Sequence, residues 1–356
     1  LVFLKRPVRW LETISRHRAS ISFGPNFAYA LCTKRVREKD LAGLDLSCWR
    51  AAGCGAEPIR ARTLNDFADK MAPYGFNPRA FVPCYGMAEA TLAISFDALG
   101  EGVRSDRVDS DELAAGRAVV VPEDKPGLEV VCCGKTFEDH QVGVFAEDDA
   151  DSAKPLDDRV IGELRIRGPS VTEGYFNEPD LTRAAFAGDW LRTGDLGYMV
   201  DGDIYICGRS KELIIVNGRN YYPQDLEWEA SRIQGVRKGN VIAFGTRKPR
   251  GDRERVVLVF ETAVAEAERE ELKEAVRKAV RETSGLSIDD VVGLDAGVLP
   301  KTSSGKLKRN ETRRLYENGQ LFERASARQG DKLDTVREIA KSQLGYVKSA
   351  LSRDKK

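Results

Sequence analysis

The stretch from residue 190 to residue 225, WLRTGDLGYMVDGDIYICGRSKELIIVNGRNYYPQD, divides the chain into two parts of different pattern. Two short apolar runs inside it, at 203–207 and 213–216, are bounded by glycine and polar residues, and both predict β-strands. A long mixed segment precedes the stretch, and a compact alternation of strands and helices follows it. The pattern therefore predicts two domains that meet near residue 210.

Three polar side chains stand beside these two strands. Asp195 is expected in a loop before the first strand, and Arg209 and Lys211 are expected in the connection to the second. Loops held by short strands commonly display binding groups. The simpler interpretation is a pair of hairpin strands with solvated charges at their turns, and the residue types alone leave both interpretations open.

Charge and cysteine content exclude several classes of protein. The 356 residues carry 56 basic and 56 acidic side chains, so no general field attracts the chain to nucleic acid or anionic lipid. Seven scattered cysteines include no CxxC pair, and there are two histidines, which argues against a zinc site or a disulfide framework and favours a reducing cytoplasm. No apolar run approaches the roughly 20 residues of a membrane span, so stable membrane insertion is not expected.

The segment before the central stretch predicts strands that alternate with helices, and then a small antiparallel sheet. Apolar residues recur on one face of the first helix, which Pro7 opens. The expected elements are a helix over 6–20, a strand over 21–23, a turn over 24–29 into a further helix, a small-residue turn over 50–59, a helix over 60–71, and sheet strands within 133–143 and 162–168.

The segment after the central stretch predicts a small α+β domain. Its one long helix places Leu272, Val276 and Val280 on a single face, and Gly285 closes it. The expected elements are strands over 241–244, 256–261 and 291–294 and a helix over 264–284. The fold class is thus mixed, with an α/β part followed by an α+β part.

The central stretch also resembles a known family. T-G-D-L-G-Y at 193–198 and G-R-S-K-E-L-I-I-V-N-G-R-N at 208–220 are similar to the core and hinge motifs of adenylate-forming enzymes: acyl-CoA synthetases, peptide-synthetase adenylation domains and luciferases. The resemblance implies that Asp195 and Arg209 bind the ribose of ATP and that Lys211 is the hinge. A carboxylate accepts two hydroxyl protons and a guanidinium is a rigid fork of donors, so both groups suit a ribose.

Three phrases of the first half carry the same resemblance. Y-G-M-A-E-A at 85–90 is similar to the Y-G-x-T-E motif, which implies that the Tyr85 ring packs on adenine and that Glu89 faces the Mg²⁺ on the phosphates. On the residues alone, Glu89 is an ordinary acid at a helix start. The phrases G-P-N-F-A-Y and G-A-E-P complete the implied sites. The implied nucleotide contacts are Gly55, Ala56, Glu57, Tyr85, Gly86, Met87, Ala88, Asp195 and Arg209, and the implied acyl wall is Asn26, Phe27 and Ala28.

The basic loop G-V-L-P-K-T-S-S-G-K at 297–306 allows three interpretations. A nucleotide P-loop requires glycine at 300 and serine or threonine at 307, where the chain has Pro300 and Leu307. A nucleic-acid surface is disfavoured because no aromatic side chain interleaves the basic ones. The loop resembles the P-K-T-x-x-G-K motif of the adenylate-forming family, which implies that Lys306 is catalytic and stabilises charge as pyrophosphate leaves.

Residues 93–131 form a long polar segment that also carries an expectation. A flexible acidic surface loop is the simpler interpretation. Its length and position resemble the insertion of fatty acyl-AMP ligases, a subfamily in which Ala88 is also usual, and a strand is expected at 118–121. The predicted organisation is the C-terminal part of the large adenylation domain at 1–210, a mobile lid domain at 211–325, and a tail at 326–356 with an amphipathic helix.

The resemblance implies a reaction and its cofactors. A fatty acyl-AMP ligase activates a long-chain fatty acid with ATP and Mg²⁺, releases pyrophosphate, and passes the acyl group to an acyl carrier protein or polyketide synthase. The upstream Ser/Thr/Gly-rich phosphate loop of that family is not found here, and the first residue is leucine, so the chain resembles the C-terminal part of the enzyme. Two alternatives stay open: an acyl-CoA synthetase of the same fold, and a non-catalytic remnant that binds an acyl-adenylate or a partner.

Overall fold

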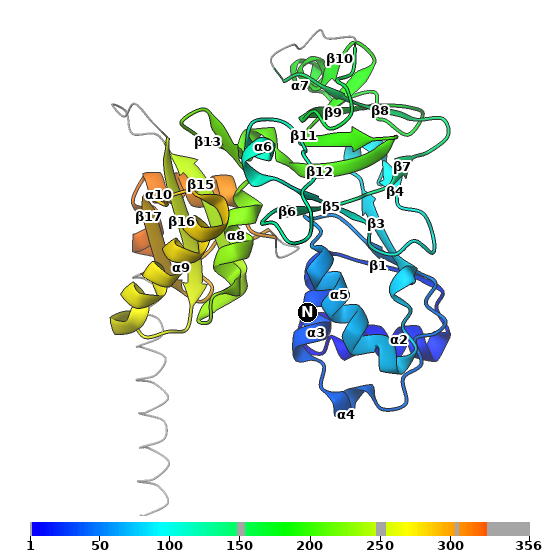
Figure 1. Cartoon of the computed structure of the whole chain (residues 1–356), viewed down its shortest axis with the longest axis horizontal. Coiled ribbons are helices and arrows are strands. Elements are labelled where there is room, and N and C mark those ends of the chain that lie inside the picture. Colours follow the sequence, from blue (N-terminus) through cyan, green and yellow to red (C-terminus); the bar gives the residue numbers. More distant parts are fainter. Residues whose placement is uncertain (1, 148–153, 247–253, 303–305, 326–356) are drawn as a thin grey trace, which may run out of the picture. The chain divides into compact units, whose positions relative to one another are not determined.

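The computed structural model describes residues 2–147, 154–246, 254–302 and 306–325, which form two compact units, Leu1–Tyr222 and Pro223–Lys356 (Figure 1). Each unit is described on its own. The units divide at Tyr222, whereas the sequence places the domain boundary at the predicted hinge, so the hinge role of Lys211 stays a prediction. The tail predicted at 326–356 lies outside the described residues.

The first unit begins with a parallel sheet that helices cover. Strands β1 (Ile21–Gly24), β2 (Ala51–Cys54) and β3 (Phe81–Tyr85) are parallel neighbours, and β4 (Ser95–Phe96) and β7 (Lys135–Thr136) extend the sheet antiparallel. The helices are α1 (Val2–Lys5), α2 (Val8–His17), α3 (Asn26–Arg35), α4 (Glu38–Leu41) and α5 (Ala61–Met71), with 3₁₀ turns η1 (Ala72–Tyr74), η2 (Pro78–Ala80) and η3 (Ala88–Ala90).

Aromatic packing fixes these helices on the sheet. Tyr29 of α3, Trp49 and Phe67 of α5 are fully buried and contact one another edge-on or stacked, with ring centroids 5.1–6.3 Å apart. The apolar face predicted over 6–20 is the buried face of α2, with Val8, Leu11 and Ile14 in this core. Helix α2 is shorter than predicted because Arg18 adopts a left-handed conformation, with φ 52°, and ends it.

A second, antiparallel sheet follows in the same unit. Its strands are β8 (Gln141–Phe145), β9 (Gly162–Arg167), β10 (Phe186–Ala187), β11 (Trp190–Val200) and β12 (Asp203–Arg209), and α7 (Pro179–Ala185) precedes β10. The predicted small antiparallel sheet is confirmed.

The loop predicted around Asp195 is wrong. Asp195 lies inside β11, paired with Arg209 of β12. The glycines that suggest a loop instead create an irregularity between Arg192 and Leu196, where Gly194 has φ 68°, and the strand continues through it.

The predicted insertion at 93–131 contains regular structure. Strands β5 (Ser105–Val108) and β6 (Leu128–Val131) pair antiparallel around helix α6 (Ser110–Ala114). The strand predicted at 118–121 is wrong, because this segment makes isolated bridges, Val108 with Val120 and Arg117 with Val160, in place of a ladder.

The insertion packs against the segment that follows the predicted hinge. Lys211 itself lies in η4 (Ser210–Glu212), and the segment after it consists of β13 (Ile214–Val216) and β14 (Arg219–Tyr221). Val108 and Leu113 share a buried cluster with Leu213 and Tyr222, and Arg219 pairs with Asp111 at 2.9 Å. This packing explains why the first unit extends to Tyr222.

The second unit is the predicted α+β domain. Its sheet has the order β15 (Val236–Thr246), β16 (Arg255–Thr262), β17 (Asp290–Asp295), and its helices are α8 (Pro223–Arg232), α9 (Arg269–Ser284) and α10 (Arg309–Glu317), with η5 (Glu266–Glu268) before α9. Gly285 ends α9 in a left-handed conformation, as predicted. None of the helices in the described part of the chain combines the length and apolarity that crossing a bilayer requires.

Candidate active site

Three predicted site segments lie at one edge of the parallel sheet. Residues 25–28 follow β1, residues 55–57 follow β2, and residues 86–89 follow β3. Because these strands are parallel neighbours, their carboxyl ends share an edge, which is where open α/β sheets bind ligands. The topology thus brings the implied acyl and nucleotide segments side by side.

The first two segments are joined by hydrogen bonds. The backbone N–H of Phe27, in the first turn of α3, donates to a carboxylate oxygen of Glu57, and the backbone N–H of Arg60 donates to Asn26 Oδ1 at 3.1 Å. An acceptor at a helix start satisfies a backbone donor that the helix cannot. Glu57 therefore holds the start of α3, a role that the sequence does not reveal. Ala28 is buried, whereas Phe27 is 42 % exposed.

Two glycines of the site, Gly55 and Gly86, pack closely against other backbone segments of the chain. A Cβ on Gly55 would lie 2.7 Å from Cys84 Sγ and from the Cys84 carbonyl oxygen, and a Cβ on Gly86 would lie 1.9 Å from the carbonyl oxygen of Leu92. The close approach of β3 leaves no room for a side chain at position 55, whereas the sequence suggests approach to a flat ligand. Ala56, beside it, has φ 65°, so the loop turns sharply into the Glu57 contact.

A buried carboxylate connects this edge to the second sheet. Tyr85 Oη, at the end of β3, donates to Asp195 Oδ2 at 2.6 Å, and Arg209 Nε donates to Asp195 Oδ1 at 3.0 Å. Asp195 is 5 % exposed, while the Arg209 side chain is 63 % exposed. The register of β11 and β12 places Asp195 and Arg209 directly opposite each other. The three predicted residues therefore form one hydrogen-bonded cluster.

Burial and charge act in opposite directions on this cluster. Burial raises the pKa of Asp195, and the hydrogen bond from Tyr85 and the charge of Arg209 partly offset that rise. The pKa of Tyr85 lies well above its usual value, first because of burial and then because of the Asp195 charge, so the phenol remains a donor at neutral pH. Tyr85 and Arg209 thus hold the two Asp195 oxygens in place, and of these two donors Arg209 is the one exposed to solvent.

We expect Tyr85→Phe to lower the free energy of unfolding by about 2 kcal/mol, because a buried carboxylate loses a hydrogen bond. The pKa of Asp195 then rises further, since one of the groups that lower it is removed. A carboxyl group with a raised folded pKa destabilises the fold when ionised, so the loss is larger at pH 7 than at pH 5. Urea unfolding at both pH values measures it, with Tyr74→Phe, a half-buried tyrosine outside the cluster, as control. An equal loss at both pH values would contradict the prediction.

Glu89 lies in η3 and is half-buried. One of its oxygens, Oε1, accepts a hydrogen bond from Tyr175 Oη at 2.9 Å, and its backbone carbonyl accepts one from the Thr172 N–H at 2.8 Å. A carboxylate has about four lone-pair sites, so Glu89 retains capacity for a cation, and one carboxylate with phosphate oxygens and water suffices for Mg²⁺. The residues present fit the implied ion. Sequence reasoning missed Tyr175, because it lies 86 residues from Glu89 along the chain.

The remaining predicted residue, Lys306, belongs to the second unit. Its backbone N–H donates to Thr302 Oγ1 at 3.0 Å, and its carbonyl accepts the Thr302 N–H at 2.8 Å. Lys301 and Leu307 form a β-bridge next to these two hydrogen bonds, and the Lys306 side chain is exposed. Lys211 is likewise exposed and lies in η4 of the first unit.

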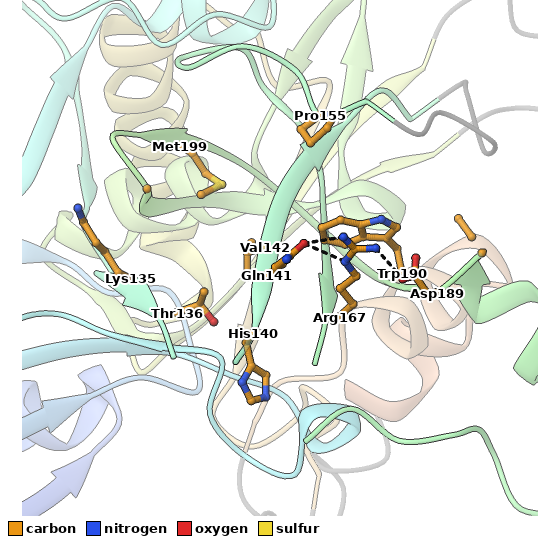
Figure 2. A pocket seen from close by; sticks show the side chains of 13 residues that line it. Lys135, Thr136, His140, Gln141, Val142, Pro155, Arg167, Asp189, Trp190 and Met199 are labelled. Carbon is orange, nitrogen blue, oxygen red and sulfur yellow. Dashed lines mark hydrogen bonds and ion pairs between the residues drawn. The ribbon is translucent and has the colours of Figure 1, made fainter. Parts of the chain in front are cut away.

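A hollow lined by residues of both sheets of the first unit has none of the predicted site residues in its lining. It encloses about 940 Å³ and is lined by Lys135, Gln141, Arg167 and Trp190, among others (Figure 2). Arg167 donates to Gln141 at 2.6 and 2.9 Å and to Asp189 at 2.6 Å, and lies 4.5 Å from the centre of the Trp190 ring. Arg167 is thus already paired within the chain.

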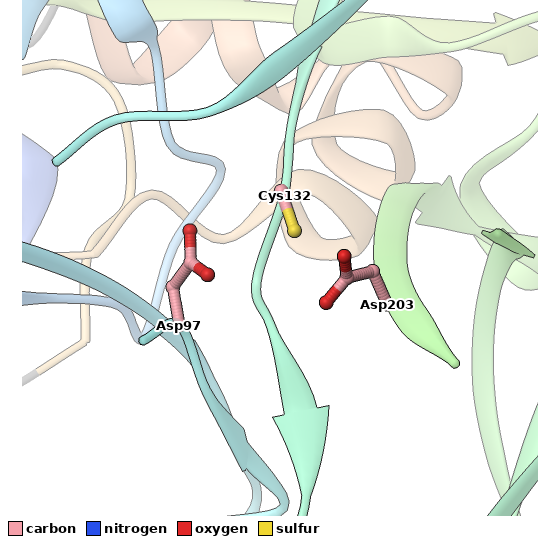
Figure 3. A group of neighbouring side chains, drawn as sticks. All are labelled: Asp97, Cys132 and Asp203. Carbon is pink, nitrogen blue, oxygen red and sulfur yellow. The ribbon is translucent and has the colours of Figure 1, made fainter. Parts of the chain in front are cut away.

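A second cluster has metal-ligand composition but a structural role. The ligand atoms of Asp97, Cys132 and Asp203 lie within 4.8 Å of one another (Figure 3). The Arg104 guanidinium donates to both carboxylates, at 3.1 Å to Asp97 and 2.7 Å to Asp203, so the position of a cation is filled. Burial raises the pKa of the Cys132 thiol to about 11, which keeps it protonated.

Comparison with known proteins adds relatives to this geometry. Residues 1–176 match the family described as AMP-binding enzyme. A protein of Caulobacter vibrioides, provisionally named an acyl-CoA synthetase, is 41% identical over 322 residues, which cover 89% of this chain and 55% of that protein. A medium-chain-fatty-acid–[acyl-carrier-protein] ligase of Teredinibacter turnerae is 36% identical over 337 residues, which cover 89% and 52%.

Solved structures agree with these relatives. A structure from a study of fatty acyl-adenylate ligases from E. coli and L. pneumophila superposes with a TM-score of 0.82 at 39% identity, and the match covers 89% of this chain and 56% of that one. The chain thus spans about half the length of the relatives that it matches.

Proposed function

This chain belongs to the adenylate-forming superfamily of AMP-binding enzymes, and on that premise we propose that it carries the nucleotide edge and the catalytic lysine of a fatty acyl-AMP ligase. The observation that carries the proposal is the cluster of Tyr85, Asp195 and Arg209 beside the carboxyl ends of three parallel strands. The activity is that of fatty-acid adenylation: fatty acid and ATP give acyl-adenylate and pyrophosphate.

The cluster suits a nucleoside monophosphate. The Tyr85 hydroxyl holds Asp195, and the Tyr85 ring is the proposed packing surface for adenine. The Asp195 carboxylate and the Arg209 fork are the proposed acceptors and donors for two ribose hydroxyls. The backbone of Gly55, Ala56, Gly86, Met87 and Ala88, with Glu57, completes the proposed nucleotide contacts. Their shared position after β2 and β3 supports this assignment.

Glu89 is the proposed ligand for Mg²⁺. Tyr175 and Thr172 fix its carboxylate and its backbone, so the side chain is oriented before any cation binds. The ion, when bound, would neutralise phosphate charge as pyrophosphate leaves. Lys306 is the proposed catalytic cation that supports the same charge from the second unit. Lys211 is the proposed hinge.

The acyl substrate is proposed to lie along the start of α3. Asn26, Phe27 and Ala28 form this start, and the Glu57 carboxylate ties it to the nucleotide segment, so acyl and nucleotide groups would meet where the new bond forms. Relatives named for medium-chain fatty acids and acyl carrier proteins support a fatty acid as substrate and a carrier protein as the acyl acceptor. A cytoplasmic location is proposed as well, in keeping with seven free thiols.

An acyl-CoA synthetase is the second candidate, because the Caulobacter relative is provisionally named one. Two observations support the ligase over it. The insertion is ordered and packs on the segment after Lys211, and Arg219 of that segment pairs with Asp111 of α6. Direct comparison of CoA with a holo-carrier protein as acceptor, after acyl-adenylate has formed, separates the two candidates.

The test is acyl-adenylate formation from dodecanoate, ATP and Mg²⁺, followed as pyrophosphate release. We would assay the 356-residue chain and a version extended at its N-terminus to the length of its relatives. Activity in the extended protein supports the ligase. An inactive extended protein that still binds the acyl-adenylate contradicts the ligase and favours a non-catalytic binding protein.

A further inference from the structure

Residues 299–302 precede Lys306 and are called the first leg below. Hydrogen bonds from Leu299 and Lys301 hold this leg on the sheet of the second unit. The N–H of Leu299 donates to Glu261 Oε1 at 3.0 Å, and Lys301 Nζ donates to Asn240 Oδ1 at 2.6 Å. Glu261 is fully buried, and Asn240 is 6 % exposed. Both acceptors come from the sheet: Glu261 from β16 and Asn240 from β15.

Asn240 reaches Lys301 because β15 is irregular at this point. Val236 pairs with Thr262 and Val241 with Phe260, so residues 237–240 stand opposite Glu261 alone. Gly239, with φ 72°, provides the left-handed turn that this bulge requires. Bulges re-aim side chains and are common beside active sites.

A second contact of the bulge secures the same leg. Arg237 Nη1 donates to Glu261 Oε2 at 2.7 Å, while the other oxygen of Glu261 holds the Leu299 N–H. The two ends of the bulge therefore hold two points of the chain, Leu299 through Glu261 and Lys301 through Asn240. A charge-assisted hydrogen bond is stronger than a neutral one, so the Lys301 contact is well suited to fix a turn.

The position of Lys306 follows from this leg. The Lys308 N–H donates to the Pro300 carbonyl at 3.0 Å, Lys301 and Leu307 form a β-bridge, and the Thr302 N–H donates to the Lys306 carbonyl at 2.8 Å. Residues 306–308 therefore pair with residues 300–302 of the first leg. A displacement of Lys301 is expected to displace Lys306 as well.

We propose that Asn240 is a positioning residue, which through Lys301 sets the place of Lys306 for the acyl-adenylate reaction. Its contact with Lys301 orders the turn, and the consequence for catalysis rests on the proposed function of Lys306. Asn240 contacts Lys301 and is proposed to act only through it. Through the hydrogen bond between Asn240 and Lys301, the β15 bulge would then fix the position of the exposed Lys306 relative to the sheet.

The test is amide hydrogen exchange in the 356-residue chain, measured by NMR with selective ¹⁵N-lysine labelling. Asn240→Ala and Lys301→Met each remove one side of the contact and are expected to speed exchange of the Lys308 amide by about ten-fold or more. Asn240→Asp retains an acceptor for Lys301 and is expected to stay within about three-fold of the unchanged chain. The Lys278 amide, on α9, reports whether the unit remains folded.

Two results would overturn the proposal. Exchange of Lys308 that is unchanged in both variants shows that the contact does not order the turn. Equal acceleration at Lys308 and Lys278 shows a general loss of stability in place of a local anchor. In an extended protein with measured adenylation, Asn240→Ala is expected to lower kcat and leave the KM for ATP unchanged. Faster exchange with an unchanged kcat, in a protein whose kcat does fall on Lys306→Ala, would overturn the positioning role of Asn240. If Lys306→Ala also leaves kcat unchanged, it is the proposed function of Lys306 that fails.

Discussion

Replacing Lys306 with alanine is expected to lower kcat for acyl-adenylate formation by about 10²–10³-fold, the usual cost of losing one group that stabilises developing charge. The KM for ATP is expected to change little, because the proposed nucleotide contacts lie in the other unit, on the edge formed by β1, β2 and β3. An interaction that is made in the transition state, and not in the ground state, lowers kcat and kcat/KM together.

The measurement is pyrophosphate release by the extended protein with dodecanoate as substrate. Lys278→Ala is the matched control, because its side chain is 77 % exposed on α9 and pairs with Glu282 at 3.8 Å. A Lys306→Ala protein with raised KM and unchanged kcat would assign Lys306 to ground-state nucleotide binding and contradict the proposed catalytic role.

Local sequence patterns predict more of the fold than of the candidate site. Apolar spacing correctly predicts the buried face of α2 and the C-terminal glycine of α9, because both depend on residues within a few turns. The pattern around Asp195 misleads, since Gly194 signals a loop while the pairing of β11 with both β9 and β12 keeps the strand continuous. Pairing with distant strands outweighs the local preference.

The candidate site shows the same division. The sequence motifs identify Tyr85, Glu89 and Asp195 as site residues but do not predict which of them are in contact. In the structure, Tyr85 donates a hydrogen bond to Asp195, which lies 110 residues away in the sequence. The partner of Glu89, Tyr175, lies 86 positions away and could not be found from spacing. Contacts of this kind depend on topology, which a single sequence does not specify.

The insertion shows why composition alone is a weak guide to order. Its many charged residues are typical of a flexible loop, but several of them are used inside the fold. Asp109 caps α6 by accepting the N–H groups of Asp111 and Glu112, and Arg159 pairs with Asp106 at 2.8 Å. A charged segment orders when its charges have fixed partners.

The Arg104 cluster is the clearest test of that principle. Arg104→Ala is expected to lower the free energy of unfolding at pH 7 by about 3 kcal/mol, because it leaves the buried Asp97 and the half-buried Asp203 without their shared cation. The Asp97 side chain is 0% exposed and that of Asp203 is 14% exposed. Arg104 is itself 36% exposed, which places the expected loss at the lower end of the range for broken buried pairs.

The loss should depend on pH with a defined sign. Arg104 holds the pKa of Asp203 below its ordinary value of 3.8, so its contribution to stability is present above that pH and is lost as pH falls through the folded pKa. The difference between Arg104→Ala and the unchanged chain should therefore be full at pH 7 and narrow below pH 3.8. Urea unfolding at neutral and acid pH measures it. Arg107→Ala is the control, because Arg107 is a half-buried arginine on β5 that donates to the backbone carbonyl of Lys125, and its expected change is within about 0.5 kcal/mol. An equal loss for both variants would mean that Arg104 acts as a surface charge and that the two carboxylates are stabilised in another way.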